Sequence, residues 1–241
     1  MQIIHAIWEK RNLGVNCYEV IVESGDTLEI LKERALEYET NYTVIKVPTG
    51  MMDISLYLQS VGYRFMEGFT TCYHSAELPN LNSIQQRMVS SVLCEKMNDK
   101  DWDQMANEIR GGMFRDDRVS LDPFFTQDQA NNRYIGWMTD EKTRGAFFFK
   151  ITYRDDAIGF FVIRNVEKRI CLGVISGIYP KFQKYAMGLC LYYYTIYESI
   201  KLNAKRIEQA FSTNNRGASA LHLSIGGYIL KEQYNVFISH K

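Results

Sequence analysis

Residues 178–188 read Ile-Tyr-Pro-Lys-Phe-Gln-Lys-Tyr-Ala-Met-Gly, and this stretch decides how the rest of the chain is interpreted. It lies between a predicted strand, residues 169–176, and a long helical run, residues 187–202. The first turn of a helix has N–H groups without internal partners and carries the positive end of the helix dipole, so it favours a phosphate or pyrophosphate. Ala186 and Gly188 allow a ligand to approach the backbone closely. The alternative interpretation is an ordinary strand-to-helix turn that binds nothing.

Length and charge limit the classes of protein that fit this chain. At 241 residues it can form one large domain or two small ones with a buried core. Lysine and arginine together number 28, as do aspartate and glutamate, so the formal net charge is zero. Since the usual electrostatic signature of a nucleic-acid binder is missing, we expect no nucleic-acid partner.

The cysteines and the N-terminus favour a cytoplasmic location. The five cysteines are odd in number and scattered, without a Cys-x-x-Cys pair, and the histidines do not cluster. This pattern predicts reduced thiols and no metal site. Residues 1–5 show no basic region followed by an apolar core, and no stretch approaches the roughly 18 apolar residues of a membrane span. We therefore expect a soluble cytoplasmic protein without a membrane span.

Residues 1–78 are predicted to form a small α/β domain. Its expected elements are a strand at 3–8, a turn at 12–14, a strand at 17–22, a helix capped by Asp26, a strand at 42–47, a helix at 51–60 and a strand at 63–73. Residues 78–82 contain a proline and two asparagines, which form turns, and they separate two different hydrophobic patterns. This segment is the predicted boundary, and residues 83–241 are the predicted second domain.

The second predicted domain begins with helices and continues as a sheet. Ser83 and Gln86 have the spacing of a capping box at the start of a helix. The predicted helices are residues 84–97, 101–109 and 127–138. They are followed by three hairpin-linked strands at 146–153, 158–164 and 169–177. After the helical run comes a strand at 205–213, a helix at 216–225 and a last strand at 228–240.

Two motifs in this second part resemble those of the GNAT N-acetyltransferase superfamily. The first is Gln183-x-x-Ala186-x-Gly188, preceded by an isoleucine, a proline and a phenylalanine at alternate positions. It resembles the loop that binds the pyrophosphate of acyl-CoA, although Ala186 replaces the first glycine of that loop. Alanine adds one methyl group and favours the helix that it opens, so we expect the replacement to be tolerated.

The second motif follows the next predicted strand. GNAT enzymes have Asn-x-x-Ala-x-x-Leu-Tyr-x-x-x-Gly-Phe at this place. The matching residues here are Asn215, Ala218, Leu221 and Gly226, whereas His222 replaces the tyrosine and Gly227 the final aromatic residue. The two motifs occur in the right order and on the expected elements, so they reinforce each other.

The resemblance implies a fold, an activity and partners. It implies an α/β protein in which a mixed, mostly antiparallel GNAT sheet with flanking helices is joined to a smaller N-terminal α/β domain. More diffuse similarities along the chain resemble the dTDP-fucosamine acetyltransferase group, which N-acetylates an amino sugar carried on a nucleotide. The implied partners are acetyl-CoA as acyl donor, a small-molecule amine acceptor that is a nucleotide sugar, and a second copy of the chain in a homodimer.

The resemblance also implies a set of site residues. Those that would hold acetyl-CoA are Gly177, Ile178, Gln183, Lys184, Tyr185, Ala186, Met187, Gly188 and Asn215. His222 would be the catalytic acid that protonates the departing thiolate, since an unperturbed histidine has a pKa near roughly 6.5. Two alternatives remain open. Asn215 fits a helix N-cap as well as it fits a cofactor contact, and His222 fits a solvated or core-edge position.

The sequence leaves the base and the acceptor open. Glu167, Glu208 and Asp122 are candidate general bases, and none stands out. The charge run at residues 115–118 could touch a sugar diphosphate, but such a run is more often a solvated surface, which we favour here. Another small-molecule or protein amine remains possible as acceptor. A GNAT-fold protein that binds CoA without catalysis is the alternative from a different functional class.

Overall fold

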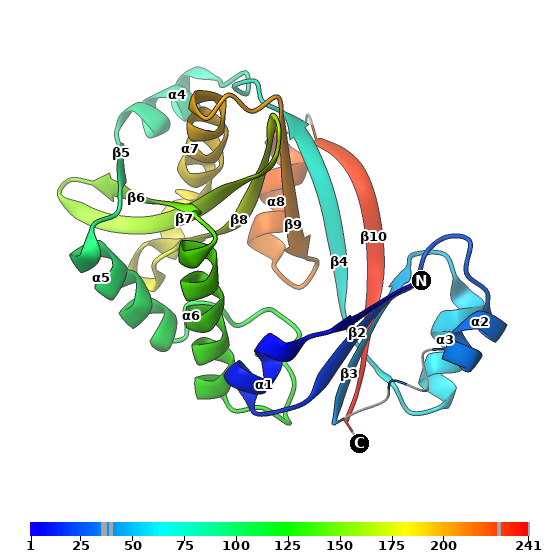
Figure 1. Ribbon diagram of the computed structural model, residues 1–241. Coiled ribbons are helices and arrows are strands. Elements are labelled where there is room, and N and C mark those ends of the chain that lie inside the picture. Colours follow the sequence, from blue (N-terminus) through cyan, green and yellow to red (C-terminus); the bar gives the residue numbers. More distant parts are fainter. Residues whose placement is uncertain (35–37, 39–40, 226–227, 241) are drawn as a thin grey trace.

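The computed structural model describes residues 1–34, 38, 41–225 and 228–240 (Figure 1). Its N-terminal part contains, in order, β1 (Gln2–His5), α1 (Ile7–Leu13), β2 (Cys17–Ile21), α2 (Leu28–Arg34), β3 (Tyr42–Pro48), α3 (Met52–Ser60) and β4 (Arg64–Ser75). The remainder contains α4 (Ser83–Ser90), β5 (Leu93–Lys96), α5 (Asp99–Arg110), α6 (Gln127–Thr143), β6 (Phe147–Tyr153), β7 (Asp156–Glu167), β8 (Ile170–Ile178), the 3₁₀ helix η2 (Pro180–Tyr185), α7 (Gly188–Lys201), β9 (Arg206–Ser212), α8 (Arg216–Ile225) and β10 (Tyr228–Ser239).

The strands of the described residues form a single sheet in the order β1-β2-β3-β10-β4-β9-β8-β7-β6-β5. The pairs β2–β3 and β8–β9 are parallel, and the other neighbours are antiparallel. Helices lie against the sheet along its length (Figure 1). The predicted class, an α/β protein with a mixed and mostly antiparallel sheet, is confirmed.

Strands from the two halves of the chain alternate at the centre of the sheet. β10 pairs with β3 on one side and with β4 on the other, and β4 in turn pairs with β9. The last strand of the chain therefore lies between two strands of its N-terminal part. Residues 78–82 connect β4 to α4, and the division into domains 1–78 and 83–241 stays a prediction.

β7, the third strand from the β5 edge of the sheet, is buried on both faces because helices cover each of them. Phe160 and Val162 pack with α5 and α6, whereas Phe161 and Ile163 pack with α4 and α7. Successive side chains of a strand point to opposite faces, so one strand contributes to two cores. At the other end of the sheet, α2 and α3 cover one face and α1 the other, next to α6.

The prediction for residues 6–14 is wrong. A strand at 3–8 and a turn at 12–14 were expected, but β1 ends at His5 and α1 follows it before β2 begins. The two strands on either side are confirmed, and they pair antiparallel. Glu9 and Leu13 are the buried residues of α1, and they lie four positions apart on one face of the helix. Gly14, interpreted as a hairpin turn, instead ends the helix in the left-handed conformation at φ 79°.

The predicted helix at 84–97 is also wrong in its second half. α4 ends at Ser90, and β5 pairs with β6 at the edge of the sheet. The capping box lies one residue earlier than predicted, since it is formed by Asn82 and Gln85. The five cysteines are free thiols. No helix within the described ranges has the length and apolar character needed to cross a membrane.

Candidate functional site

The site begins where two parallel strands separate. β8 and β9 pair only through residues 170–172 and 206–208. Beyond these pairs β8 continues along β7 as far as Ile178, and β9 continues along β4 as far as Ser212. The two strands therefore diverge, and the edge of β8 along residues 173–178 lacks a partner strand among the described residues. A cavity of about 1000 Å³ occupies this gap and extends to the N-terminal strands.

The loop after β8 leads directly into this cavity. Tyr179 is buried and anchors the loop, η2 follows, and α7 begins at Gly188. Met187 is the N-cap residue of α7, and no side-chain hydrogen bond from the described residues caps the helix. The N–H of Cys190 donates to the carbonyl oxygen of Met187 at 2.9 Å, so the N–H groups of Gly188 and Leu189 are the ones in this turn that are left for a ligand.

Ala186 does not belong to α7, because it lies before the helix in the left-handed conformation at φ 54°. The sequence-based reason for tolerating this alanine, that it favours the helix, is therefore wrong. A residue with a Cβ atom in this conformation costs about 1–2 kcal/mol. The glycine of the GNAT motif would avoid that cost.

Most of the predicted site residues line the cavity: Gly177, Ile178, Gln183, Ala186, Gly188, Asn215 and His222. Gln183 is tied to the end of β8, since its Nε2 donates to the carbonyl oxygen of Ile178 at 3.3 Å. Lys184 and Tyr185 are exposed and lie outside the lining, and Met187 packs into the core that contains α4 and α7. Gly226 and Gly227 lie outside the described residues.

Asn215 caps α8. Its Oδ1 accepts a hydrogen bond from the backbone N–H of Ala218 at 3.0 Å, which is the N-cap arrangement considered as an alternative from the sequence. The same residue lines the cavity. Its contact with a cofactor stays a prediction.

His222 lies on α8 and is 7% exposed. Its ring stacks on Phe211 with centroids 4.7 Å apart and faces His74 at 5.4 Å. Burial, together with the neighbouring His74, lowers the pKa of His222 to about 4. The imidazole is therefore neutral at pH 7, whereas the predicted acid role assumed an unperturbed pKa. That role stays a prediction.

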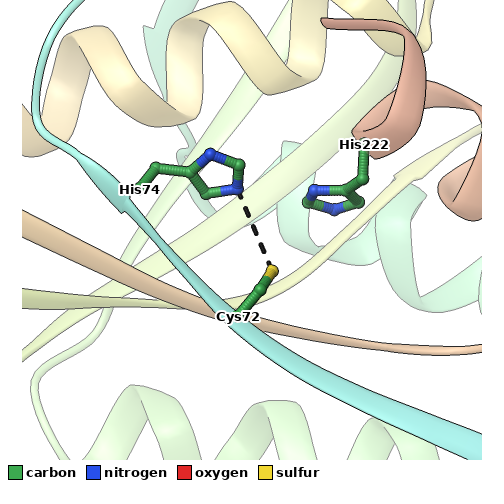
Figure 2. Close-up of side chains that lie close together, drawn as sticks. All are labelled: Cys72, His74 and His222. Carbon is green, nitrogen blue, oxygen red and sulfur yellow. Dashed lines mark hydrogen bonds between the residues drawn. The ribbon is translucent and has the colours of Figure 1, made fainter. Parts of the chain in front are cut away.

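Cys72 and His74, two positions apart on β4, lie beside His222 (Figure 2). The atoms of Cys72, His74 and His222 that could bind a metal lie within 4.8 Å of one another, and Cys72 Sγ is 4.0 Å from His74 Nε2. Thiol and imidazole groups suit zinc, but structural zinc sites use four ligands and need the thiolate. Burial raises the pKa of Cys72 to about 11, so this cluster is neutral at pH 7. The absence of a metal stays a prediction.

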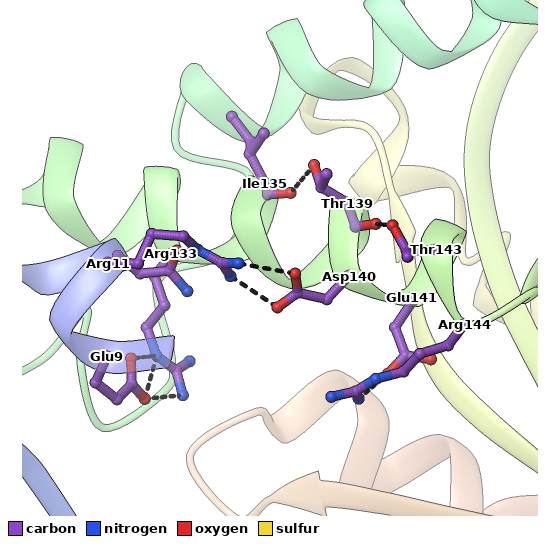
Figure 3. Close-up of polar contacts among 10 residues, drawn as sticks. Glu9, Arg11, Arg133, Ile135, Thr139, Asp140, Glu141, Thr143 and Arg144 are labelled. Carbon is purple, nitrogen blue, oxygen red and sulfur yellow. Dashed lines mark hydrogen bonds and ion pairs between the residues drawn. The ribbon is translucent and has the colours of Figure 1, made fainter. Parts of the chain in front are cut away.

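The inner end of the cavity, towards β2 and β3, is lined by buried charged groups. Arg118 donates to Glu19 at 2.6 Å, and Lys46 is 3.1 Å from the same carboxylate. Burial alone would raise the pKa of Glu19, but Arg118 and Lys46 lower it to about 2. Beside them Arg133 of α6 binds both carboxylate oxygens of Glu9 at 2.8 and 2.9 Å (Figure 3). These positive and negative groups neutralise one another.

The charge run at residues 115–118 divides between two environments. Arg115 and Asp116 are exposed, in agreement with the prediction that this run forms a solvated surface. That prediction is wrong for Arg118, whose side chain is 11% exposed and paired with Glu19. Asp117 also turns inward, where its carboxylate accepts hydrogen bonds from the hydroxyl of Ser120 and the N–H of Val119.

The cavity contains a carboxylate that the sequence did not single out. Glu67 of β4 is 3% exposed and lines the cavity, whereas the three candidate bases Glu167, Glu208 and Asp122 do not. Asp122 pairs with His240 and Arg64, and Glu208 pairs with Arg206 and Lys231. Nothing in the sequence around Glu67 marks it, because only the folded sheet brings it next to the cavity.

No family model matches the chain, and no curated protein matches it in sequence. Solved structures do match. A GCN5-related N-acetyltransferase from Sphaerobacter thermophilus has a TM-score of 0.57 and 11% identity, covering 88% of this chain and 64% of that one. A tandem GNAT protein from the clavulanic acid biosynthesis pathway has a TM-score of 0.54 and 10% identity, covering 93% and 75%.

A third match is the glucosamine N-acetyltransferase region of a fungal multi-domain β-N-acetylglucosaminidase. It has a TM-score of 0.60 and 10% identity, and it covers 99% of this chain and 31% of that one. At such identities the similarity establishes the fold alone, and neither the activity nor the substrate. The GNAT fold predicted from the two motifs is thereby confirmed.

Proposed function

We propose that this protein is an acetyl-CoA-dependent N-acetyltransferase that transfers an acetyl group directly to a primary amine in a ternary complex. One observation carries the proposal: the gap between β8 and β9 opens beside the uncapped start of α7. An unpaired strand edge and an anion-binding helix terminus thus face one cavity. Acetyl-CoA has a diphosphate and an amide-bearing arm that match these two features.

Each part of the site has a place in this proposal. The N–H groups at the start of α7 bind the diphosphate, and the exposed Lys184 adds positive charge at the rim. The free edge of β8, ending at Gly177 and Ile178, binds the amide-bearing arm as an added strand. Asn215 contacts the same arm from the start of α8. The thioester then lies between β8 and β9.

In this proposal His222, which lines the cavity, lies opposite the departing sulfur. Because its imidazole is neutral at pH 7, it acts as a hydrogen-bond donor to the sulfur and not as an imidazolium. The same neutrality favours a second candidate function, a GNAT-fold protein that binds CoA without catalysis.

We propose a nucleotide-linked amino sugar as the acceptor, in a homodimeric enzyme similar to the dTDP-fucosamine acetyltransferase group. The cavity supports a large acceptor, since it extends past the gap between β8 and β9 as far as Trp8, Glu19 and Lys46. The fungal neighbour, whose name gives glucosamine as its acceptor, supports the amino sugar.

The test is product formation from acetyl-CoA with four acceptors: a dTDP-linked amino sugar, glucosamine, putrescine and a lysine peptide. Mass spectrometry measures the acetylated product, and thermal unfolding measures binding of acetyl-CoA. We expect acetyl-CoA to raise the melting temperature and the sugar amines to be acetylated fastest. Stabilisation without product from any amine would favour the non-catalytic alternative. Neither stabilisation nor product would contradict both.

A further inference from the structure

Glu67 is a buried carboxylate without a dedicated counter-ion. Its Oε2 is inaccessible and has no hydrogen-bond partner within the described part of the chain. The neighbouring carboxylates are all satisfied: Glu9 by Arg133, Glu19 by Arg118 and Lys46, and Asp117 by Ser120. Burying an unpaired charge is costly, and proteins normally compensate it. Burial accordingly raises the pKa of Glu67, and a cationic partner from outside the chain would relieve the cost of its charged form.

The backbone around Glu67 is fixed to the turn that leads into α8. Gly68 donates to Thr213 Oγ1 at 3.1 Å and accepts from the Thr213 N–H at 2.8 Å. On the other side, the Asn214 side chain donates to the carbonyl oxygen of Met66 at 3.1 Å. Asn215, which lines the cavity, is the next residue of that turn. Glu67 thus lies on the cavity wall beside the expected position of the cofactor arm.

The groups that face Glu67 come from several elements and do not neutralise it. Burial is the largest influence on the pKa of Glu67 and raises it, and the nearby charge of Asp117 raises it further. The charges of Arg118 and Lys46 and a hydrogen bond with Ser212 lower it, but the net effect is a rise. Arg118 and Lys46 are already paired with Glu19. Asp116 also lines the cavity, but it is exposed to solvent. Glu67 is the buried carboxylate of the lining that has an oxygen without a partner among the described residues, so a cationic group in the cavity would gain most by pairing with it.

We propose that Glu67 binds the acceptor as its ammonium ion and takes one proton from it, so the acceptor is an aliphatic amine that is protonated in water. This inference rests on the proposed acetyl transfer. The Glu67 carboxylate removes one N–H proton, and the freed nitrogen lone pair forms the C–N bond to the acetyl carbonyl carbon. The C–S bond breaks, sulfur leaves as thiolate and receives the second nitrogen proton, and Glu67 returns its proton to water.

The experiment compares Glu67→Gln with the wild-type protein on two kinds of acceptor. One is the aliphatic amine acetylated fastest in the four-acceptor panel, and the other is aniline, which is uncharged at neutral pH. General bases contribute about 10²–10⁴-fold to a rate, so we expect kcat/KM for the aliphatic amine to fall at least about a hundredfold. For aniline, which carries no proton to remove before attack, we expect a change below about threefold.

The pH profile provides a second measurement on the wild-type protein alone. Glu67 must be ionised to accept the proton, so kcat/KM for the aliphatic amine is expected to rise with pH through the raised pKa of Glu67 and then level off. The profile with aniline is expected to lack this rise. If Glu67→Gln does not fold, this comparison decides, and identical acid limbs for both amines would overturn the proposal.

Matched controls separate this inference from the proposed function. Glu208→Gln removes a carboxylate of β9 that lies outside the cavity lining, and we expect it to leave both activities unchanged. Acetyl-CoA should stabilise Glu67→Gln as much as the wild-type protein. Failure of acetyl-CoA to bind the wild-type protein would refute the proposed function. Normal wild-type turnover with unchanged kcat/KM in Glu67→Gln would refute only the role of Glu67.

Discussion

The two ends of the cavity are built in different ways. One end, where we propose that acetyl-CoA binds and which we call the cofactor end, is lined by residues of β8 and of the start of α7, which follow one another in the chain. The inner end is lined by buried side chains such as Glu19, Glu67 and Arg118, which come from distant segments. The cofactor end therefore depends on backbone conformation, whereas the inner end depends on the balance of buried charges.

This difference predicts how each end responds to substitution. A buried charge that loses its partner is strongly destabilising. A loop whose backbone does the binding tolerates changes of side chain, provided that its φ and ψ angles are kept. Substitutions at the inner end should therefore affect the stability of the whole protein, whereas those in the loop should have smaller effects.

The largest expected effect comes from Arg133→Met. Glu9 is fully buried, and Arg133 binds both of its carboxylate oxygens. Without Arg133, the nearest cation is Arg118, at 3.7 Å from Glu9. We expect the free energy of unfolding to fall by about 3–5 kcal/mol, the usual cost of breaking a buried pair from one side. Urea unfolding measures it.

Arg11→Met is the matched control for this prediction. Arg11 and Asp140 also join α1 to α6, through two hydrogen bonds of 2.9 and 2.7 Å (Figure 3). The Arg11 side chain is 56% exposed, so the pair should contribute only about 0–1 kcal/mol. Equal losses in the two variants would show that burial does not distinguish the two ion pairs.

The smallest expected effect comes from Ala186→Gly at the cofactor end. Glycine relieves the left-handed strain, about 1–2 kcal/mol, but makes the unfolded chain more flexible. We expect a net gain in stability of about 0.5–1 kcal/mol by thermal or urea unfolding. Ala220→Gly, at an exposed position of α8, should lose about that amount. Losses in both variants would contradict the strained conformation of Ala186.

Much of the fold could be predicted because its signals are local. The hydrophobic periodicity of strands and helices, together with the two motifs, predicted α7, α8 and the strands β6 to β9 close to their observed positions. Errors arose where a local signal had two meanings. Gly14 fits a hairpin turn or a helix end, and residues 93–96 continue a helical pattern although they form an edge strand. Tertiary packing decides such cases.

The sequence pointed to only part of the cavity lining, namely residues within 177–188 together with Asn215 and His222. Residues 177–188 are contiguous, so a motif can reveal them. Glu67 pairs with Val236 of β10 and borders a turn that contains Thr213, and no spacing in the sequence reflects these contacts. The pKa of His222 was missed for the same reason, since its burial depends on Phe211 and His74 from other strands.

The central claim is that the free edge of β8 and the start of α7 bind acetyl-CoA. Hydrogen–deuterium exchange of the wild-type protein, measured with and without acetyl-CoA, tests it most directly. Bound amides exchange more slowly, so we expect protection at residues 173–178 and 186–190 and little change at α2 and α3. Protection confined to other segments, or none under conditions where acetyl-CoA is bound, would contradict the claim.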